Sequence, residues 1–442
     1  MSIEISGESR RGWRRLVDIR PGEGALIAWA SLYVFSLMTA YYVLRPLRDA
    51  FGVESGIENL PWLFTATLVA MIALNPLYAA LVRRLVARRV VTLVYLFFLT
   101  TLAGFGVASH VVDPQGIVWV GRAFFVWLSV FNLFVVSIFW TLMVDIFDSG
   151  GAKRLFGFLS AAATLGATLG STIAATLAKV LTADLLMACA GALLVVAIFC
   201  VWRIVNLARG VPSRSHPDLE REAVGGGLLA GLGHVARSPY LLNIGVYILL
   251  FAVTSTFLYF QQAEIAKASF ADRSARTAFF AQVDLAVNLL TLAVQLLLTG
   301  RMLKHLGTPV CAALLPAMTL VGFAILAWSP TIGALVVFQV ARRVGNFGLA
   351  KPTREVLFTV ISREDKYKAK NVVDTVVYRL GDQVGAWSYA LLGGLGIVGL
   401  SLAALPIAAV WLGVGWWLGT RQEAMARNLS ADGGPLPQSL SR

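Results

Sequence analysis

The sequence has little charge, few cysteines and few histidines for its length. Only 14% of its 442 residues are charged, whereas 58% are hydrophobic. Soluble chains carry about a quarter charged residues, so this composition excludes an ordinary soluble protein. Neither the three cysteines nor the four histidines are spaced as a disulfide framework or a metal site. A Walker-type phosphate loop and a Ser/His/Asp set are also absent, so we expect no enzyme activity, no metal and no cofactor.

The sequence does contain repeated apolar runs of 20 or more residues, the length that crosses a hydrocarbon core of ~30 Å as a helix. The alternating ten-residue segments of an outer-membrane barrel are absent. No cleavage site follows the first run, so we interpret it as a span rather than a signal peptide. We predict an all-α polytopic membrane protein of about twelve spans, at 25–47, 61–82, 90–111, 117–147, 155–181, 183–206, 241–262, 276–302, 308–329, 331–360, 370–396 and 398–420.

The distribution of lysine and arginine predicts the orientation. With both termini inside, 25 of the 37 Lys and Arg residues fall on the inner side and four on outer loops. This asymmetry obeys the positive-inside rule. We therefore expect both termini to be cytoplasmic, in a bacterial-type cytoplasmic (inner) membrane. The same rule explains the net charge of +13 without nucleic acid as a partner.

One long polar connection, containing "RGVPSRSHPDLEREAVGGG", divides the chain after the sixth span. A repeated spacing suggests that the two halves are related, because Lys153 precedes Gly166 by thirteen residues and Lys368 precedes Gly381 by thirteen. Two related six-helix halves are typical of major-facilitator-like transporters. We predict a cytoplasmic tail (1–24), an N-terminal half (25–206), a cytoplasmic linker (207–240), a C-terminal half (241–420) and a second cytoplasmic tail (421–442).

Charged residues within the spans indicate where a site lies. A charge near the bilayer centre costs at least ~2.5–3.5 kcal/mol, so it usually faces the bundle interior or a watery cavity. Eight cations lie within the spans or at their ends: Arg45, Arg48, Arg122, Arg342, Arg343, Lys351, Arg354 and Arg379. Six acids accompany them: Asp49, Asp145, Asp284, Glu355, Asp374 and Asp382.

Span ten has the highest density of these charges. Arg343, Lys351 and Arg354 share one arc of about 120° on a helix. Asn346 widens this polar face. Pro352 lacks a backbone donor and is expected to open the helix near Lys351, as in the broken helices that line transporter cavities. We interpret these residues as substrate-binding, the alternative being a structural ion-pair network between helices.

Span one ends in a second charged group. Arg45 and Asp49 are spaced i,i+4 and are able to neutralise each other, which leaves Arg48 without a local partner. Tyr42 lies one turn deeper. It is interpreted either as a stacking platform for a substrate ring or as a member of the interfacial belt.

Spans eight and eleven carry the candidate coupling residues. Asp284 is a membrane carboxylate that either titrates as a proton or cation coupling site or pairs with a cation of span ten. Arg379 and Asp382 are spaced i,i+3 and are expected to pair with each other first. Asp382 is the second coupling candidate.

The excess of cations over acids favours a small anionic solute. Arginine forks match phosphate oxygens, so a phosphorylated solute such as a nucleotide is one candidate. We expect membrane lipid to be the other partner and the chain to act as a monomer.

Three stretches resemble the ATP/ADP-translocase (NTP/NDP exchange) family of bacterial and plastid membranes: "LRPLRDAFG", "FWTLMVDIFDSGGAKRLFGFLSAAATLGATLGS" and "KPTREVLFTVISREDKYKAKNVVDTVVYRLGD". They cover roughly a fifth of the chain. The resemblance implies a cavity cation at Arg48, an acidic partner at Asp145 and an exchange-critical lysine at Lys370. The exchangers carry a glutamate in span seven, where "LLFAVTSTFLYFQQ" has Thr, Ser and Gln. Lys351 and Asp382 also depart from that family's pattern.

Three functions are consistent with these observations. The first is an alternating-access exchanger of an anionic solute, such as a nucleotide or a phosphorylated metabolite. The second is a proton-coupled carrier or exporter of another small molecule, in which Asp284 titrates. The third is a membrane scaffold or sensor that uses a transporter fold without transporting.

Overall fold

The computed structural model describes residues 23–84, 87–146, 149–208, 238–361, 369–370 and 372–431. Within these ranges every regular element is a helix, and ten helices are long and apolar enough to cross a membrane. The prediction of an all-α polytopic membrane protein is confirmed. Most of the predicted tails and linker lies outside the described residues.

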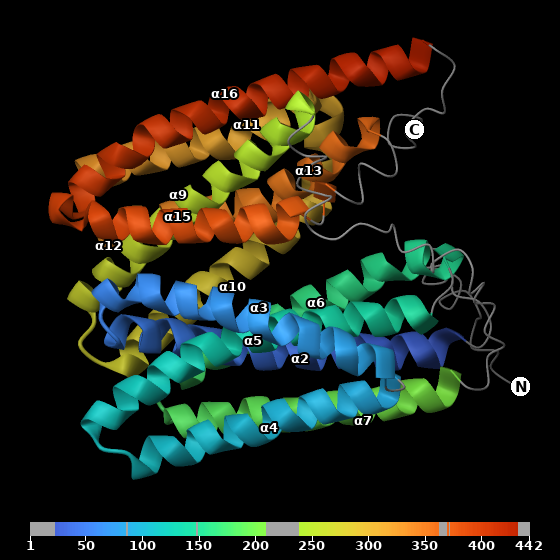
Figure 1. Cartoon of the computed structure of the whole chain (residues 1–442), viewed down its shortest axis with the longest axis vertical. Helices are drawn as coiled ribbons and strands as arrows, with labels where there is room; N and C mark the ends of the chain where they lie inside the picture. The colour runs from blue at the N-terminus through green and yellow to red at the C-terminus, as the bar shows by residue number, and fades with distance from the viewer. Residues whose placement is uncertain are drawn as a thin grey trace, which may run out of the picture. The chain divides into compact units, whose positions relative to one another are not determined.

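The chain divides into two compact units, one formed by residues 1–48 and 69–217 and the other by 49–68 and 218–442. The first unit contains most of α2 (Glu23–Glu54) and the second part of α3 (Leu60–Arg84), followed by α4 (Ala87–Val111), α5 (Pro114–Ile146), α6 (Ser149–Leu177) and α7 (Ala183–Ala208). Within this unit α4 and α7 run side by side (Figure 1).

The second unit contains the remaining helices. These are α9 (Pro239–Ser269), α10 (Arg273–Leu297), α11 (Thr299–Trp328), α12 (Ile332–Gly345), η2 (Asn346–Ala350), α13 (Lys351–Leu357), η3 (Phe358–Val360), η4 (Val373–Val377), α15 (Tyr378–Leu391), η5 (Gly393–Leu395) and α16 (Gly396–Ala431). The long helices α11 and α16 pack along each other (Figure 1). The unit also includes residues 49–68, which we call the hairpin tip: the end of α2, the turn η1 (Ile57–Asn59) and the start of α3.

Glycine pairs allow close helix packing in both units. A Cβ at Gly166 of α6 would lie 2.4 Å from the Phe35 carbonyl oxygen of α2, and Gly170 meets the next turn of α2 in the same way. In the second unit, a Cβ at Gly381 of α15 would lie 2.6 Å from the Ala252 Cβ of α9, and Gly385 again follows one turn later. Small residues let membrane helices approach backbone to backbone. In each unit, two helices therefore meet through a pair of glycines spaced four residues apart.

The predicted spans ten and eleven are interrupted helices rather than continuous ones. Span ten runs as α12, the π-helical segment η2, α13 and the 3₁₀ turn η3, and span eleven enters α15 through the π-helical segment η4. A π-helix widens one turn and releases backbone groups from the regular hydrogen-bond ladder. This break begins at Asn346 and ends directly before Lys351. It agrees with the prediction that the helix opens near Lys351.

Side chains satisfy the carbonyl groups that this break exposes. Pro352 has no N–H, so the Gly348 carbonyl lacks its α-helical donor. The Thr299 hydroxyl donates to that carbonyl at 2.5 Å, and the Gln295 side chain donates to the Phe347 carbonyl at 3.1 Å. The Thr353 hydroxyl donates to the next carbonyl along the segment at 2.9 Å. The break is therefore a built feature, since helices α10 and α11 supply its hydrogen bonds.

Candidate functional site

Arg342 is a buried cation in the middle of span ten, and its side chain is held by neutral groups. Only 4% of its surface is exposed. Its guanidinium donates four hydrogen bonds of 2.8–3.1 Å, to the hydroxyls of Thr254, Ser255 and Thr319 and to the Phe251 carbonyl. Among the described residues no carboxylate pairs with it. Within the described part of the second unit, the charge of Arg342 is therefore not offset by a carboxylate.

Arg343, the next residue, forms an ion pair with Asp284 of α10. The Nη1–Oδ1 distance is 2.6 Å, and the two side chains are 13% and 3% exposed. Gln295 lies further along α10, and its side chain donates to the Phe347 carbonyl at the break in span ten. Asp284 and Gln295 of span eight thus both face span ten. The alternative in which Asp284 pairs with a cation of that span is the one observed.

Three further ion pairs lie in spans ten and eleven and in the segment that connects them. The Arg354–Asp374 distance is 3.4 Å and the Lys370–Glu355 distance is 2.5 Å. Arg379 and Asp382 lie 3.2 Å apart, as their i,i+3 spacing predicts. Within the described residues, Lys370 thus pairs with Glu355 of span ten.

Lys351 is different because it has no carboxylate partner in the described part of the chain. Its ammonium lies 4.6 Å from the centre of the Phe347 ring, and its side chain is exposed. Arg354 and Asp374 lie within electrostatic range of it. Lys351 is therefore an accessible cation whose charge is only partly offset by its neighbours.

Tyr378, which begins α15, connects these charges. The centroids of the Tyr378 and Phe251 rings lie 6.0 Å apart. The Arg379 guanidinium lies 5.9 Å from the centre of the Tyr378 ring. Phe251 in turn lies under the Arg342 guanidinium, at 5.1 Å. Arg342, Arg354, Arg379 and Asp382 all act electrostatically on the Tyr378 hydroxyl. We call the group formed by Arg342, Lys351, Arg354, Asp374, Tyr378, Arg379 and Asp382 the cationic cluster.

The first unit carries its own cations on α2 and α5. The Arg48 guanidinium lies 4.9 Å above the Phe125 ring and 3.5 Å from the Ser129 hydroxyl. Arg45 lies 5.6 Å from the ring of Tyr42, one turn earlier. Tyr42 therefore contacts a cation of its own helix, which neither of the two interpretations from the sequence had considered. Asp145 lies in the last turn of α5, and its side chain is outside the described residues.

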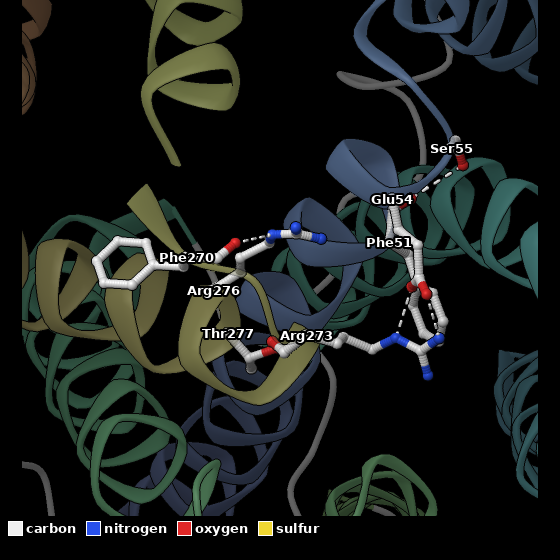
Figure 2. A network of polar contacts seen from close by, with 7 residues as sticks. All are labelled: Phe51, Glu54, Ser55, Phe270, Arg273, Arg276 and Thr277. Atoms are coloured by element: carbon white, nitrogen blue, oxygen red, sulfur yellow. Dashed lines mark hydrogen bonds and ion pairs between the residues drawn. The ribbon is translucent and has the colours of Figure 1, made fainter. Parts of the chain in front are cut away.

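The hairpin tip is joined to α9, α10 and α15 by several polar and aromatic contacts. Arg273 at the start of α10 donates to both carboxylate oxygens of Glu54, at 2.6 and 2.7 Å, and lies 4.4 Å from the Phe51 ring (Figure 2). The Tyr259 hydroxyl donates to Asp49 at 3.0 Å. Trp62 of the tip also packs edge-on against Trp387 of α15, at 4.8 Å.

Sequence reasoning missed three of these features. Glu54 and Arg273 are 219 positions apart, so no spacing rule links them. Tyr378 lies in an apolar run and carries no charge. Span seven was predicted to end at residue 262, but α9 continues to Ser269 and includes Glu264, a half-buried carboxylate. The stated absence of a glutamate from span seven is therefore corrected.

Comparisons with known proteins show the fold. No protein-family model and no curated protein matches the chain. The structure is similar to the nucleoside transporter NupG in a mutant form, with a TM-score of 0.57 and 13% identity over 90% of this chain and 99% of that one. It is similar to a POT family transporter in complex with a conjugated peptide, with a TM-score of 0.62 and 9% identity over 90% and 96%.

The structure is also similar to the human organic anion transporter MFSD10 (TETRAN), with a TM-score of 0.56 and 14% identity over 90% of this chain and 100% of that one. At these identities the similarity shows the fold and gives no information about the substrate. The chain is thus an integral membrane protein with a major-facilitator-like fold.

Proposed function

We propose that this protein is an alternating-access transporter that exchanges small anionic solutes across a bacterial-type inner membrane. The observation that carries the proposal is the cationic cluster, in which four cations face two carboxylates. Lys351, which is exposed and has no carboxylate partner among the described residues, would be the part of it that a solute reaches. The major-facilitator-like fold supports a transport function, since its structural neighbours are themselves transporters.

The resemblance to ATP/ADP translocases supports a nucleotide or a phosphorylated metabolite as the solute. Arg48 and Lys370, which that resemblance implies, would then take part in exchange. Lys370 is held by Glu355 at 2.5 Å, so a solute would compete with that carboxylate for its ammonium. The proposed orientation, with both termini cytoplasmic, rests on the distribution of Lys and Arg in the loops.

Reconstituted liposomes test the proposal. Liposomes loaded with an anionic solute should take up labelled solute only when counter-substrate is present, without a requirement for a pH gradient. The Lys351→Met variant should lose most of this exchange. Uptake that requires a pH gradient and ignores the internal solute would instead support proton coupling through Asp284.

A scaffold or sensor function makes a different prediction. In that case purified protein would exchange no solute, and Lys351→Met would change no cellular phenotype. Asp284 is 3% exposed and paired with Arg343, which favours a structural role for this carboxylate over coupling. The exchange assay therefore separates all three functions.

A further inference from the structure

The charge of the cationic cluster sets the charge of the group that it best binds. Arg342, Lys351, Arg354 and Arg379 are cations, whereas Asp374 and Asp382 are the carboxylates within range. Two positive charges are therefore left over in the cluster. The Lys370–Glu355 pair beside it is neutral as a whole and does not change this excess.

Each arginine of the cluster is held by protein groups. Arg342 uses its guanidinium on four neutral acceptors, and Arg354 and Arg379 each contact a carboxylate. These guanidinium groups are therefore held in place and supply fixed positive potential. Potential of this kind favours anions without contacting them.

Among the donors of the described part of the cluster that remain available are the Lys351 ammonium and the Tyr378 hydroxyl, besides Arg354 Nε, which is buried without a hydrogen-bond partner. The Lys351 ammonium is exposed and contacts only an aromatic ring. The Tyr378 hydroxyl has no hydrogen-bond partner among the described residues, and the side chain is only half-buried. The ring itself is fixed between Phe251 and Arg379, so the hydroxyl is held in place before any solute arrives.

We propose that Tyr378 is a substrate-binding residue and that the substrate carries a phosphate monoester, which this cluster recognises. A phosphate monoester bears about −1.5 to −2 charge at pH 7 and three strong acceptor oxygens. That charge matches the two excess positive charges, to which Lys351 contributes one, and an oxygen accepts from the Tyr378 hydroxyl. A carboxylate or a sulfate ester would offset only one of the two charges, and a polyphosphate would exceed them. This inference rests on the proposed function and narrows its solute class.

Binding to the purified full-length protein tests the inference with phenyl phosphate and phenyl sulfate as probes. The two probes share the aromatic ring and the ester geometry and differ in charge at pH 7.5. We expect phenyl phosphate to bind at least about tenfold more tightly by calorimetry. The Tyr378→Phe variant, which keeps the ring, should weaken phenyl phosphate binding roughly tenfold to a hundredfold, the usual effect of a hydrogen bond to a charged group.

Two further variants sharpen the test. Lys351→Met removes one positive charge and should reduce the preference for phenyl phosphate over phenyl sulfate. Tyr389→Phe is the matched control, because it removes a buried hydroxyl from the same helix α15, where its ring packs on Phe257 and Phe260. Its phenyl phosphate affinity should equal that of the wild type.

Equal affinity for both probes, or an unchanged affinity in Tyr378→Phe, would overturn the inference. If the protein exchanges another class of anion and ignores phenyl phosphate, the inference fails while the proposed function stands. If it neither binds nor exchanges any anion, the proposed function fails as well.

Discussion

The broken region of span ten makes a precise prediction about Thr299. Its hydroxyl donates to the Gly348 carbonyl at 2.5 Å, closer than its 3.2 Å contact with the Val294 carbonyl. Thr299→Val keeps the shape of the side chain and removes the donor. Because Pro352 offers no N–H, the Gly348 carbonyl would then lose its partner.

The magnitude follows from the burial of this bond. A buried carbonyl without a donor costs about 1–3 kcal/mol, whereas hydrogen bonds between membrane helices are measured at about 0.6–2 kcal/mol. The Thr299–Gly348 contact is part-buried, so we expect a loss of about 1 kcal/mol. For a unit of this size that corresponds to a fall in Tm of roughly 2–4 °C.

A double-mutant cycle with Pro352→Ala identifies the cause. An alanine at this position restores an N–H that is able to donate to Gly348, so Thr299→Val should cost almost nothing in that background. Thermal unfolding in detergent, followed by tryptophan fluorescence, measures all four proteins. Thr176→Val is the control, because its hydroxyl donates to an i−4 carbonyl in a regular stretch of α6. The reasoning is refuted if Thr299→Val costs the same with and without Pro352.

Three other predictions concern packing and ion pairing. In a Glu54→Gln and Arg273→Gln cycle, the two-bond pair at 2.6 and 2.7 Å should show a coupling of about 1 kcal/mol in thermal stability, and additive losses would argue against it. Gly166→Ala should destabilise the first unit by about 1–3 kcal/mol because its Cβ meets a carbonyl oxygen at 2.4 Å. Gly157→Ala, where nothing lies within 4 Å, should be tolerated, and equal losses would contradict the packing argument. Asp284→Asn leaves its arginine uncompensated and should cost about 3–5 kcal/mol, measured by thermal unfolding; full stability would show that the pair is not structural.

Local sequence rules predicted those parts of the fold and the site that depend on neighbouring residues. The apolar runs predicted the helices because each must satisfy its own backbone in lipid. The i,i+3 spacing predicted the Arg379–Asp382 pair, and Pro352 predicted a break in span ten. Such features need no knowledge of which helices are adjacent.

The remaining features depend on tertiary contacts that no local pattern encodes. Arg342 looks like an ion-pairing residue in the sequence, yet its partners are neutral groups of α9 and α11. The position of Tyr378 in the cationic cluster requires the packing of α15 on α9. Glu264 was missed because the end of a span is hard to place where apolar and polar residues mix.

The glycine pairs have a mechanical consequence for any transport cycle. Where α6 meets α2, and where α15 meets α9, the glycines lie against backbone atoms and the Cβ atoms of Tyr42, Ala252 and Thr256, with no flexible side-chain end between the helices. Flexible side chains elsewhere are able to change rotamer and absorb sliding, but these contacts have nothing to rearrange. We therefore expect the two helices of each pair to move together as one rigid body. Movement within a unit is left to helices joined by deformable side chains and to the π-helical segments of spans ten and eleven.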